Sequence, residues 1–223
     1  SVELLRLDSD VAASYRRLTR VLETFADPGA SILVGTQMIA KGHHFPEVTL
    51  VGVVDADLTL HFPDFRAEER TFAMLVQVGG RSGRGPSAGR VLVQTLSPEA
   101  RPIALAAGGE QERFYAEEIE ARAALGYPPS RSLIGLELSS PVREKAEKGS
   151  AFVADKVTAL LAGRADVLGP GPVYRERGRH IARVLVKTAD IGTTLDVLRP
   201  WVEHYGPGLA ARGARLVADV DPQ

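Results

Sequence analysis

Cysteine is absent from all 223 residues of the sequence, and neither sign of charge prevails. The absence of cysteine excludes disulfide bonds and thiolate metal sites within the chain. With 27 basic and 28 acidic residues the formal net charge is −1, which excludes a protein that coats nucleic acid through overall positive charge. Any contact with nucleic acid must therefore come from a local basic patch.

Long hydrophobic runs are missing as well. No apolar stretch approaches the roughly 18 residues of a membrane-spanning helix, and the first residues lack the charged and apolar regions of a secretion signal. We therefore expect a cytoplasmic protein with no membrane partner. Ser1 is followed at once by a strand-like run, from which we expect the chain to be a piece of a longer protein.

A further absence is the loop with which motor ATPases cradle phosphates. That loop has the pattern G-x-x-x-x-G-K-[ST], and the sequence contains no Gly-Lys dipeptide, so the chain cannot build one. Residues 51–57, V-G-V-V-D-A-D, imitate the apolar strand and carboxylate that hold Mg²⁺, but no Glu follows the Asp. We expect Asp55 and Asp57 to end a strand and to bond its turn.

What the sequence does contain is an alternation of strand-like and helix-like segments over residues 1–108. Continuous apolar runs such as residues 48–54 are typical of strands buried in a parallel sheet. The alternation predicts an α/β layered domain. We expect strands at residues 2–8, 31–34, 48–54 and 89–95, and helices that begin near residues 9, 65 and 97.

Residues 109–129 are predicted to link this domain to a second one. They comprise a charged helix and the joint Gly126-Tyr127-Pro128-Pro129, where we place the domain boundary. Residues 130–223 then follow the order β-α-β-β-α-β, the split βαβ pattern of a small α+β domain. Pro200 falls inside the last predicted helix, where we expect a kink or a restart. The expected strands are residues 132–138, 167–168, 181–187 and 215–219, and the expected helices are residues 142–161 and 191–204.

Residues 72–85, F-A-M-L-V-Q-V-G-G-R-S-G-R-G, combine a helical apolar face with glycines at its C-terminal end. Each interior glycine costs a helix about 1 kcal/mol relative to alanine, so a requirement other than packing retains them. Gln77, Arg81 and Arg84 stand at i, i+4 and i+7 and share one face. Two forked guanidiniums on one face suit a polyphosphate. The alternative is two solvated arginines after a helix C-terminus, favoured by the helix dipole; the whole pattern favours the functional interpretation.

The loop predicted after the second strand gathers hydroxyl, amide, ammonium and imidazole groups between residues 36 and 45. This composition suits contacts to the phosphate oxygens of a nucleic-acid backbone. His43 and His44 are an alternative metal site, but adjacent residues seldom converge on one ion and no third ligand is nearby in sequence, so we predict no metal site. The candidate residues of this loop are Thr36, Gln37, Lys41, Gly42 and His43.

The densest basic run lies between residues 174 and 187, where four arginines and a lysine stand against one Glu. Arg183 and Lys187 are four apart on a predicted strand and therefore lie on the same face. Nucleic-acid binding and a solvated hairpin explain this run equally well. The candidate DNA-binding residues are Arg175, Arg177, Arg179, Arg183 and Lys187.

Two of these stretches resemble helicase motifs. Residues 77–85, Q-V-G-G-R-S-G-R-G, are similar to the last conserved motif of superfamily 2 helicases, whose arginines reach the γ-phosphate of ATP held by the other motor lobe. Residues 32–46, I-L-V-G-T-Q-M-I-A-K-G-H-H-F-P, resemble the preceding motif of the PriA family of primosomal replication-restart helicases. The resemblance covers nearly the whole chain and extends to Y-P-P at residues 127–129, V-L-G-P at 167–170, L-V-K at 185–187 and D-V-D-P at 219–222.

The resemblance implies the C-terminal part of a RecA-like second helicase lobe at residues 1–108, followed by the small α+β domain. It implies that Gln77, Arg81 and Arg84 act in ATP hydrolysis, and that the candidate loop residues lie near the nucleotide cleft and the tracked strand. ATP and Mg²⁺ are expected mainly on a first lobe outside this chain, and zinc only on cysteines upstream, so the chain alone is expected to be inactive. Gly79 stands where an Ala is usual, a mild departure from the family pattern.

The implied activity is ATP-dependent 3′ to 5′ DNA unwinding, with recognition of stalled forks. The implied partners are forked and single-stranded DNA, single-stranded DNA-binding protein, primosome proteins and the replicative helicase. A second interpretation is a DNA-binding primosome scaffold without enzymatic activity, whose motor has lost its P-loop; the intact motif at residues 77–85 favours the helicase. A third, another superfamily 2 motor, shares R-x-G-R but does not explain residues 219–222.

Overall fold

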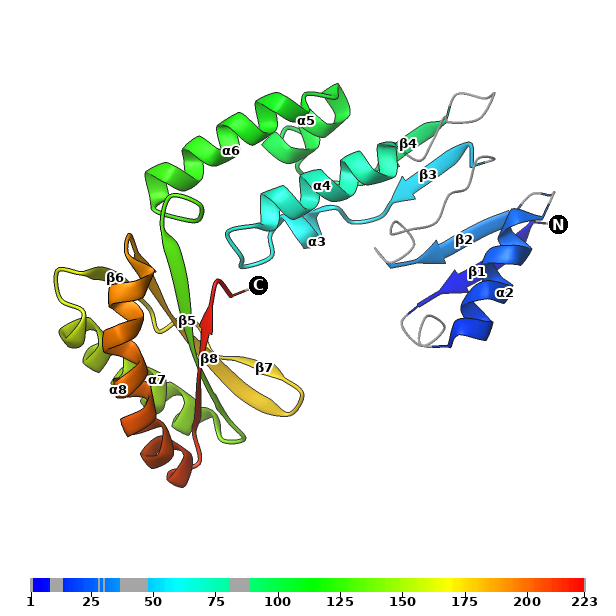
Figure 1. The fold of residues 1–223 in the computed structure, drawn as a ribbon. Helices are drawn as coiled ribbons and strands as arrows, with labels where there is room; N and C mark the ends of the chain where they lie inside the picture. The colour runs from blue at the N-terminus through cyan, green and yellow to red at the C-terminus, as the bar shows by residue number, and fades with distance from the viewer. Residues whose placement is uncertain are drawn as a thin grey trace. The chain divides into compact units, whose positions relative to one another are not determined.

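The computed structural model divides the chain into two compact units, Ser1–Ala116 and Glu117–Gln223. The division falls within helix α6 (Gln111–Leu125), inside the linking segment expected at residues 109–129. None of the described helices is long and apolar enough to cross a membrane. Figure 1 traces the chain. The structure describes residues 2–8, 14–27, 29, 31–36, 48–80 and 89–222.

The N-terminal unit contains two two-stranded parallel sheets within its described residues. In the first sheet, β1 (Glu3–Leu7) pairs with β2 (Ser31–Gly35), and α2 (Tyr15–Ala26) lies between them in the chain. In the second sheet, β3 (Leu50–Val53) pairs with β4 (Arg90–Val93). The parallel pairing that the apolar runs predict is therefore present in both sheets.

Helix α4 (Ala67–Gly79) packs against the second sheet. It forms because Phe72, Leu75 and Val78 recur at helical spacing, and all three side chains are buried. Leu75 packs in one cluster with Ala56, Val53 and Val93, which ties the helix to both strands of the sheet. The helices of this part of the unit are α3 (Asp57–Leu60), α4 (Ala67–Gly79) and α5 (Arg101–Gly108).

The start of helix α5 differs from the prediction. We expected a helix from Ser97, but residues 97–100 form a turn, which is closed by a 3.0 Å hydrogen bond from the Ala100 N–H to the Ser97 carbonyl. The helix begins at Arg101 and carries Pro102 in its first turn. A proline is tolerated there because the N–H that it lacks has no partner within the helix.

The C-terminal unit is an antiparallel sheet with strand order β6-β8-β5-β9, and the short strand β7 pairs with β8. Together with the first unit, it confirms the mixed α/β class. Strand β7 is an addition to the predicted order. The elements are β5 (Ser132–Ser140), α7 (Arg143–Leu160), β6 (Ala165–Leu168), β7 (Tyr174–Glu176), β8 (Arg179–Thr188), α8 (Ile191–Ala211) and β9 (Arg215–Val220).

Alternation along β5 and β8 places the core of this unit on one face of the sheet. Ile134, Leu136 and Leu138 of β5 and Val184 and Val186 of β8 are at most 1% exposed and share a cluster with residues of α7 and α8. Because side chains alternate along a strand, these even-numbered residues face the two helices, and the odd-numbered residues lie on the other face. Figure 1 shows both helices beside the sheet.

Helix α8 continues through Pro200, so of the kink or restart expected there, the restart is not observed. A proline inside a helix loses one hydrogen bond and its ring clashes with the preceding turn, at a cost of about 3 kcal/mol. Leu198 and Leu209, on either side of it, are buried in the core of the C-terminal unit. The packing of the helix on the sheet therefore offsets the local cost, an effect that propensity alone does not include.

Candidate nucleic-acid interface and arginine motif

Strands β7 and β8 form a hairpin whose tip is the dipeptide Arg177-Gly178. Both residues have positive φ, 46° for Arg177 and 79° for Gly178. This is the conformation of the tight two-residue turns that suit twisted antiparallel strands. The Arg177 side chain is 92% exposed. The hairpin therefore presents an arginine to solvent at its outer end.

The register of the hairpin sends its basic side chains to both faces. Arg179, Arg183 and Lys187 are separated by even numbers of residues on β8, so they lie on one face. Arg175 pairs with His180, an even position of β8, and lies on the opposite face. The predicted shared face of Arg183 and Lys187 is confirmed, but the five basic residues do not form one patch on a single face.

Two of these arginines form hydrogen bonds to residues of strand β5. Arg179 donates from Nη2 to the Ser139 carbonyl (2.9 Å) and from Nε to the Ser139 hydroxyl (3.3 Å), so its charge lies beside neutral partners. Arg183 donates from Nε to Glu137 Oε2 (3.2 Å), and its guanidinium carbon lies 5.7 Å from the Tyr174 ring centroid. Glu137 therefore offsets part of the Arg183 charge. Tyr174 is not among the residues predicted from the sequence to bind DNA, although its place at the start of the basic run is a signal.

Lys187 is buried, in contrast to the residues of the hairpin. Its side chain lies at the far end of β8, and the residue is only 7% exposed. The ammonium donates to the carbonyl of Leu125 (2.9 Å) and lies 3.4 Å from the centroid of the Tyr127 ring. Its charge is already engaged within the C-terminal unit, and we do not include it in the nucleic-acid interface.

Of the candidate arginine motif, the structure describes only the first member. Gln77 lies exposed in the last turn of α4, which ends at Gly79. Arg81 and Arg84 lie outside the described residues. Helix α4 thus ends where the sequence places its glycines, two residues before the first arginine.

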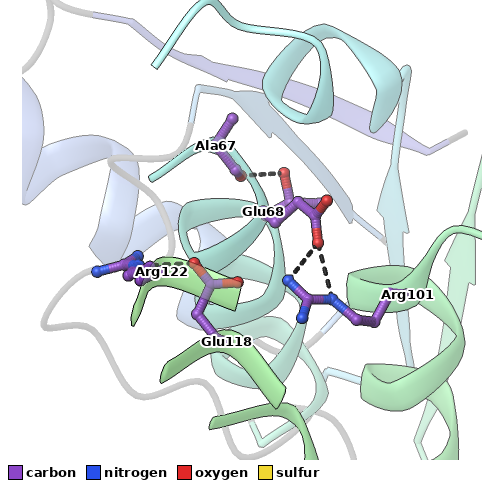
Figure 2. A network of polar contacts seen from close by, with 6 residues as sticks. Ala67, Glu68, Arg101, Glu118 and Arg122 are labelled. Carbon is purple, nitrogen blue, oxygen red and sulfur yellow. Dashed lines mark hydrogen bonds and ion pairs between the residues drawn. The ribbon is translucent and has the colours of Figure 1, made fainter. Parts of the chain in front are cut away.

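The N-terminal half of α4 is tied to its neighbours in the same unit. Figure 2 shows Glu68 accepting hydrogen bonds from Arg101 of α5, from Nε at 2.9 Å and from Nη2 at 2.6 Å. Phe72 stacks on Phe114, with ring centroids 3.9 Å apart and both residues fully buried. These contacts fix the helix from which the motif at residues 77–85 extends.

The loop after β2 is described only at its first residue. Thr36 directly follows the strand and is exposed. Gln37, Lys41, Gly42 and His43 lie outside the described residues, as does the alternative metal ligand His44. Across the described ranges, no group of three or more His, Cys, Asp or Glu residues is arranged to hold a metal ion.

Asp57 joins the ends of strands β3 and β4. Its carboxylate accepts hydrogen bonds from the Leu96 N–H (2.8 Å) and from the Thr95 hydroxyl (3.1 Å). These bonds stabilise the charged form, and the one from the Leu96 backbone is the main reason that the pKa of Asp57 lies below its ordinary value. The hydrogen bonds of Asp57 thus reach the segment after β4, and Asp55, two residues before Asp57, has a φ of 54°.

A comparison with protein families identifies the C-terminal unit. Residues 123–223 match the family model described as the Primosomal protein N C-terminal domain. Among solved structures, a de novo designed protein with a ferredoxin fold is 17% identical, with a TM-score of 0.32, and the match covers 42% of this chain and 86% of that one. We draw no conclusion from that likeness.

Curated relatives match nearly the whole chain, and each bears the name Replication restart protein PriA. The protein of Treponema pallidum is 37% identical over 221 residues, which cover 98% of this chain and 33% of the relative. That of Bacillus subtilis is 35% identical over 224 residues, covering 100% of this chain and 28% of the relative. That of Haemophilus influenzae is 33% identical, covering 98% and 30%. The chain spans about one third or less of the length of these relatives.

Proposed function

Because the chain belongs to the PriA family, we propose that it forms the second motor lobe and the C-terminal domain of a replication-restart protein that unwinds DNA 3′ to 5′ at the expense of ATP. In this proposal residues 1–108 are the C-terminal part of a RecA-like lobe. The observation that carries it is the match of 98% of the chain to relatives named for replication restart, together with an intact Q-V-G-G-R-S-G-R-G motif.

The role of the motif at residues 77–85 is to complete a nucleotide site in trans. Gln77 lies in the last turn of helix α4, and Arg81 and Arg84 follow the helix in the sequence. In this proposal all three contact the γ-phosphate of ATP, and the other lobe provides the P-loop and holds the Mg²⁺. Such arginines stabilise the charge that develops on the transferred phosphoryl group, and they contribute roughly 10³-fold or more to turnover. The chain alone has the stabilising groups but not the loop that binds ATP.

The role of the C-terminal unit is to hold DNA. The hairpin places Arg175, Arg177 and Arg179 on its two faces and tip, where they neutralise phosphates without reading sequence. The loop residues Thr36, Gln37, Lys41, Gly42 and His43 contact the tracked strand near the nucleotide cleft. The proposed partners are forked and single-stranded DNA, single-stranded DNA-binding protein, primosome proteins and the replicative helicase.

The test of the motor assignment uses a longer protein that also contains a P-loop lobe. Arg81→Ala and Arg84→Ala are each expected to lower kcat for ATP by roughly 10³-fold while DNA affinity stays nearly unchanged, because only the transition state loses its stabilising charge. Wild-type turnover in both variants would overturn the assignment. Arg16→Ala is the matched control, since Arg16 lies exposed on α2 and its loss is expected to leave turnover unchanged.

A further inference from the structure

The helix-free face of the C-terminal sheet is covered over only one half. At that half, Leu133 is 1% exposed beside Lys187, whose ammonium lies under the Tyr127 ring. On the next row Gly135 is covered by the end of the chain: a Cβ at Gly135 would lie 3.2 Å from Cγ of Pro222. The joint after α6 and the C-terminal residues thus close this half of the face.

The other half of the same face is covered less completely: Ile181 and Ser139 at its centre are 7% and 8% exposed, but the side chains around them reach solvent. Its two rows of side chains follow from the strand register, because cross-strand partners share a face. Tyr174 is 39% exposed and Val217 38% exposed, and the side chain of Arg183 is 48% exposed. One row runs Tyr174, Ile181, Ser139, Arg215 and the other runs Arg183, Glu137, Val217; Arg179 adjoins them. We refer to these eight residues as the open half-face.

We propose that the open half-face binds unpaired bases of single-stranded DNA, with one base stacked on the Tyr174 ring and the flanking phosphates on the neighbouring arginines. The proposal deepens the DNA-binding function proposed above and rests on it. It adds a base-contacting residue and a preference for single strands to an interface otherwise described by charge alone.

The chemistry of the open half-face fits an unpaired nucleotide better than a duplex. Every base has a π-face that can stack on an aromatic side chain, but in a duplex those faces are already stacked on one another, so only a single strand offers them. Tyr174 provides an aromatic platform, and Val217 adds apolar surface three strands away in the sheet. An open face of a small antiparallel sheet with an aromatic residue on it is a general way to bind single strands.

The charges at the rim fit the same ligand. Arg215 on the open half-face makes no ion pair within the described part of the chain. Arg179 bonds only to the neutral Ser139 among its described partners. Glu137 offsets part of the Arg183 charge, so the middle of the face is close to neutral while its edges are positive. Tyr174 lies on the edge strand β7, so a base stacked on its ring would have Arg179, two residues along the hairpin, within reach of a flanking phosphate.

The phenol of Tyr174 stays neutral under all ordinary conditions. Partial burial is the main cause that raises its pKa above the usual value of about 10. A neutral ring does not repel phosphates, so the stacking contribution is expected to be constant between about pH 7 and pH 9. A change in affinity over that range would have to come from other groups.

The experiment compares two ligands of equal charge on the complete chain. One is an oligothymidylate, and the other is a strand of the same length whose sites are abasic, so that phosphates are kept and bases removed. Affinities are measured by fluorescence anisotropy at one salt concentration. We expect the wild-type chain to bind the oligothymidylate about tenfold more tightly, since stacking of one base contributes that order of magnitude.

The variants identify the side chain responsible for that ratio. Tyr174→Leu is expected to bring it close to one, whereas Tyr174→Phe, which keeps the ring, is expected to preserve it. Tyr15→Leu is the matched control, because Tyr15 is a more exposed tyrosine on α2 of the other unit. Thermal unfolding of each variant checks that the C-terminal unit is folded.

Each outcome decides for or against the proposal. A ratio near one in the wild-type chain, or a ratio unchanged by Tyr174→Leu in a folded variant, overturns the stacking site and leaves the hairpin as a purely electrostatic binding surface. Failure of the wild-type chain to bind either strand refutes DNA binding by this chain altogether, and with it the proposed function of the C-terminal unit. In that case the open half-face is a surface for a protein partner. A base-dependent ratio that depends on the Tyr174 ring supports the proposal.

Discussion

Lys187 on strand β8 donates a 2.9 Å hydrogen bond to the carbonyl of Leu125, the last residue of helix α6. The last carbonyls of a helix have no partner within the helix, and a cation near that end also interacts favourably with the helix dipole. The same ammonium lies 3.4 Å from the centroid of the Tyr127 ring. The buried ammonium of Lys187 therefore attaches both the C-terminal end of α6 and Tyr127 to the C-terminal sheet.

This interaction predicts that Lys187→Met affects stability and not DNA affinity. Methionine keeps much of the apolar stem, but the Leu125 carbonyl loses a charged donor, so we expect a loss of about 2 kcal/mol in the free energy of unfolding. Urea unfolding measures it. Lys148→Met is the control, because Lys148 pairs with Glu144 on the exposed surface of α7 and its replacement is expected to change stability much less.

The same variant also tests whether Lys187 contacts a phosphate of DNA. If Lys187 neutralised a phosphate, its removal would change the slope of log K against log salt by about 0.7 on single strands. We expect no change in that slope. A flatter slope for Lys187→Met, with folding intact, would return Lys187 to the DNA-binding residues.

The behaviour of Lys187 also shows what sequence patterns can and cannot predict. Period-two alternation on β8 correctly placed Lys187 and Arg183 on one face, because strand geometry is local. It could not indicate that one of them is buried, since the ring and carbonyl that cover Lys187 come from residues 125 and 127, about 60 positions earlier. The most regular elements, β5 and α7, were predicted closely because local sequence patterns determine them.

Long-range bonds account for the remaining differences in a similar way. Asp57 was expected to bond its own turn, but its partners, Thr95 and Leu96, follow a different strand and lie nearly 40 residues later. Helix α8 runs through Pro200 because burial of its flanking residues offsets the local cost. Strand β7 was missed because three residues give no measurable period, and only pairing with β8 defines it.

The hairpin predicts electrostatic DNA binding that changes with salt. Replacing Arg175, Arg177 and Arg179 together by Ala is expected to weaken binding uniformly across sequences and to flatten the salt slope, by about 0.7 for each phosphate that the variant no longer neutralises on single strands. Labelled single-stranded DNA titrated at several salt concentrations measures both quantities. Identical affinities and slopes would assign the hairpin to solvent or to a protein partner.

A matched triple variant controls for the loss of net charge. Arg164, Arg199 and Arg212 are exposed arginines of the same unit, outside the hairpin. Their joint replacement by Ala changes the net charge of the chain equally but is expected to leave the slope nearly unchanged. Equal effects of the two triple variants would mean that overall charge, not the hairpin, governs binding.

The chain alone is expected to hydrolyse no ATP, with or without DNA. It contains the arginines proposed to act in trans but no Gly-Lys dipeptide from which a P-loop could be built. A coupled assay of phosphate release with the purified chain, in the presence of single-stranded DNA, measures this. Turnover that DNA stimulates and that Arg84→Ala abolishes would refute the assignment of the chain to a partner lobe.

The hydrogen bonds of Asp57 predict how the N-terminal unit responds to acid. The pKa of Asp57 is lowered in the folded protein, chiefly by the Leu96 N–H, relative to about 3.9 in the unfolded chain. A carboxylate of this kind contributes stability that is fully present above the unfolded pKa and is lost as the pH falls through the folded pKa. Asp57→Asn should therefore be less stable than wild type at neutral pH.

The difference between the two proteins is expected to be constant above about pH 5 and to shrink below about pH 4, because the wild-type carboxyl then takes up a proton and its advantage disappears. Urea midpoints followed by circular dichroism across that range measure it. Asp196→Asn, at an exposed position of α8 in the other unit, should show little difference at any pH. A constant difference between wild type and Asp57→Asn down to pH 3 would mean that the charge of Asp57 is not the source of its contribution, because that charge is lost as the carboxyl takes up a proton.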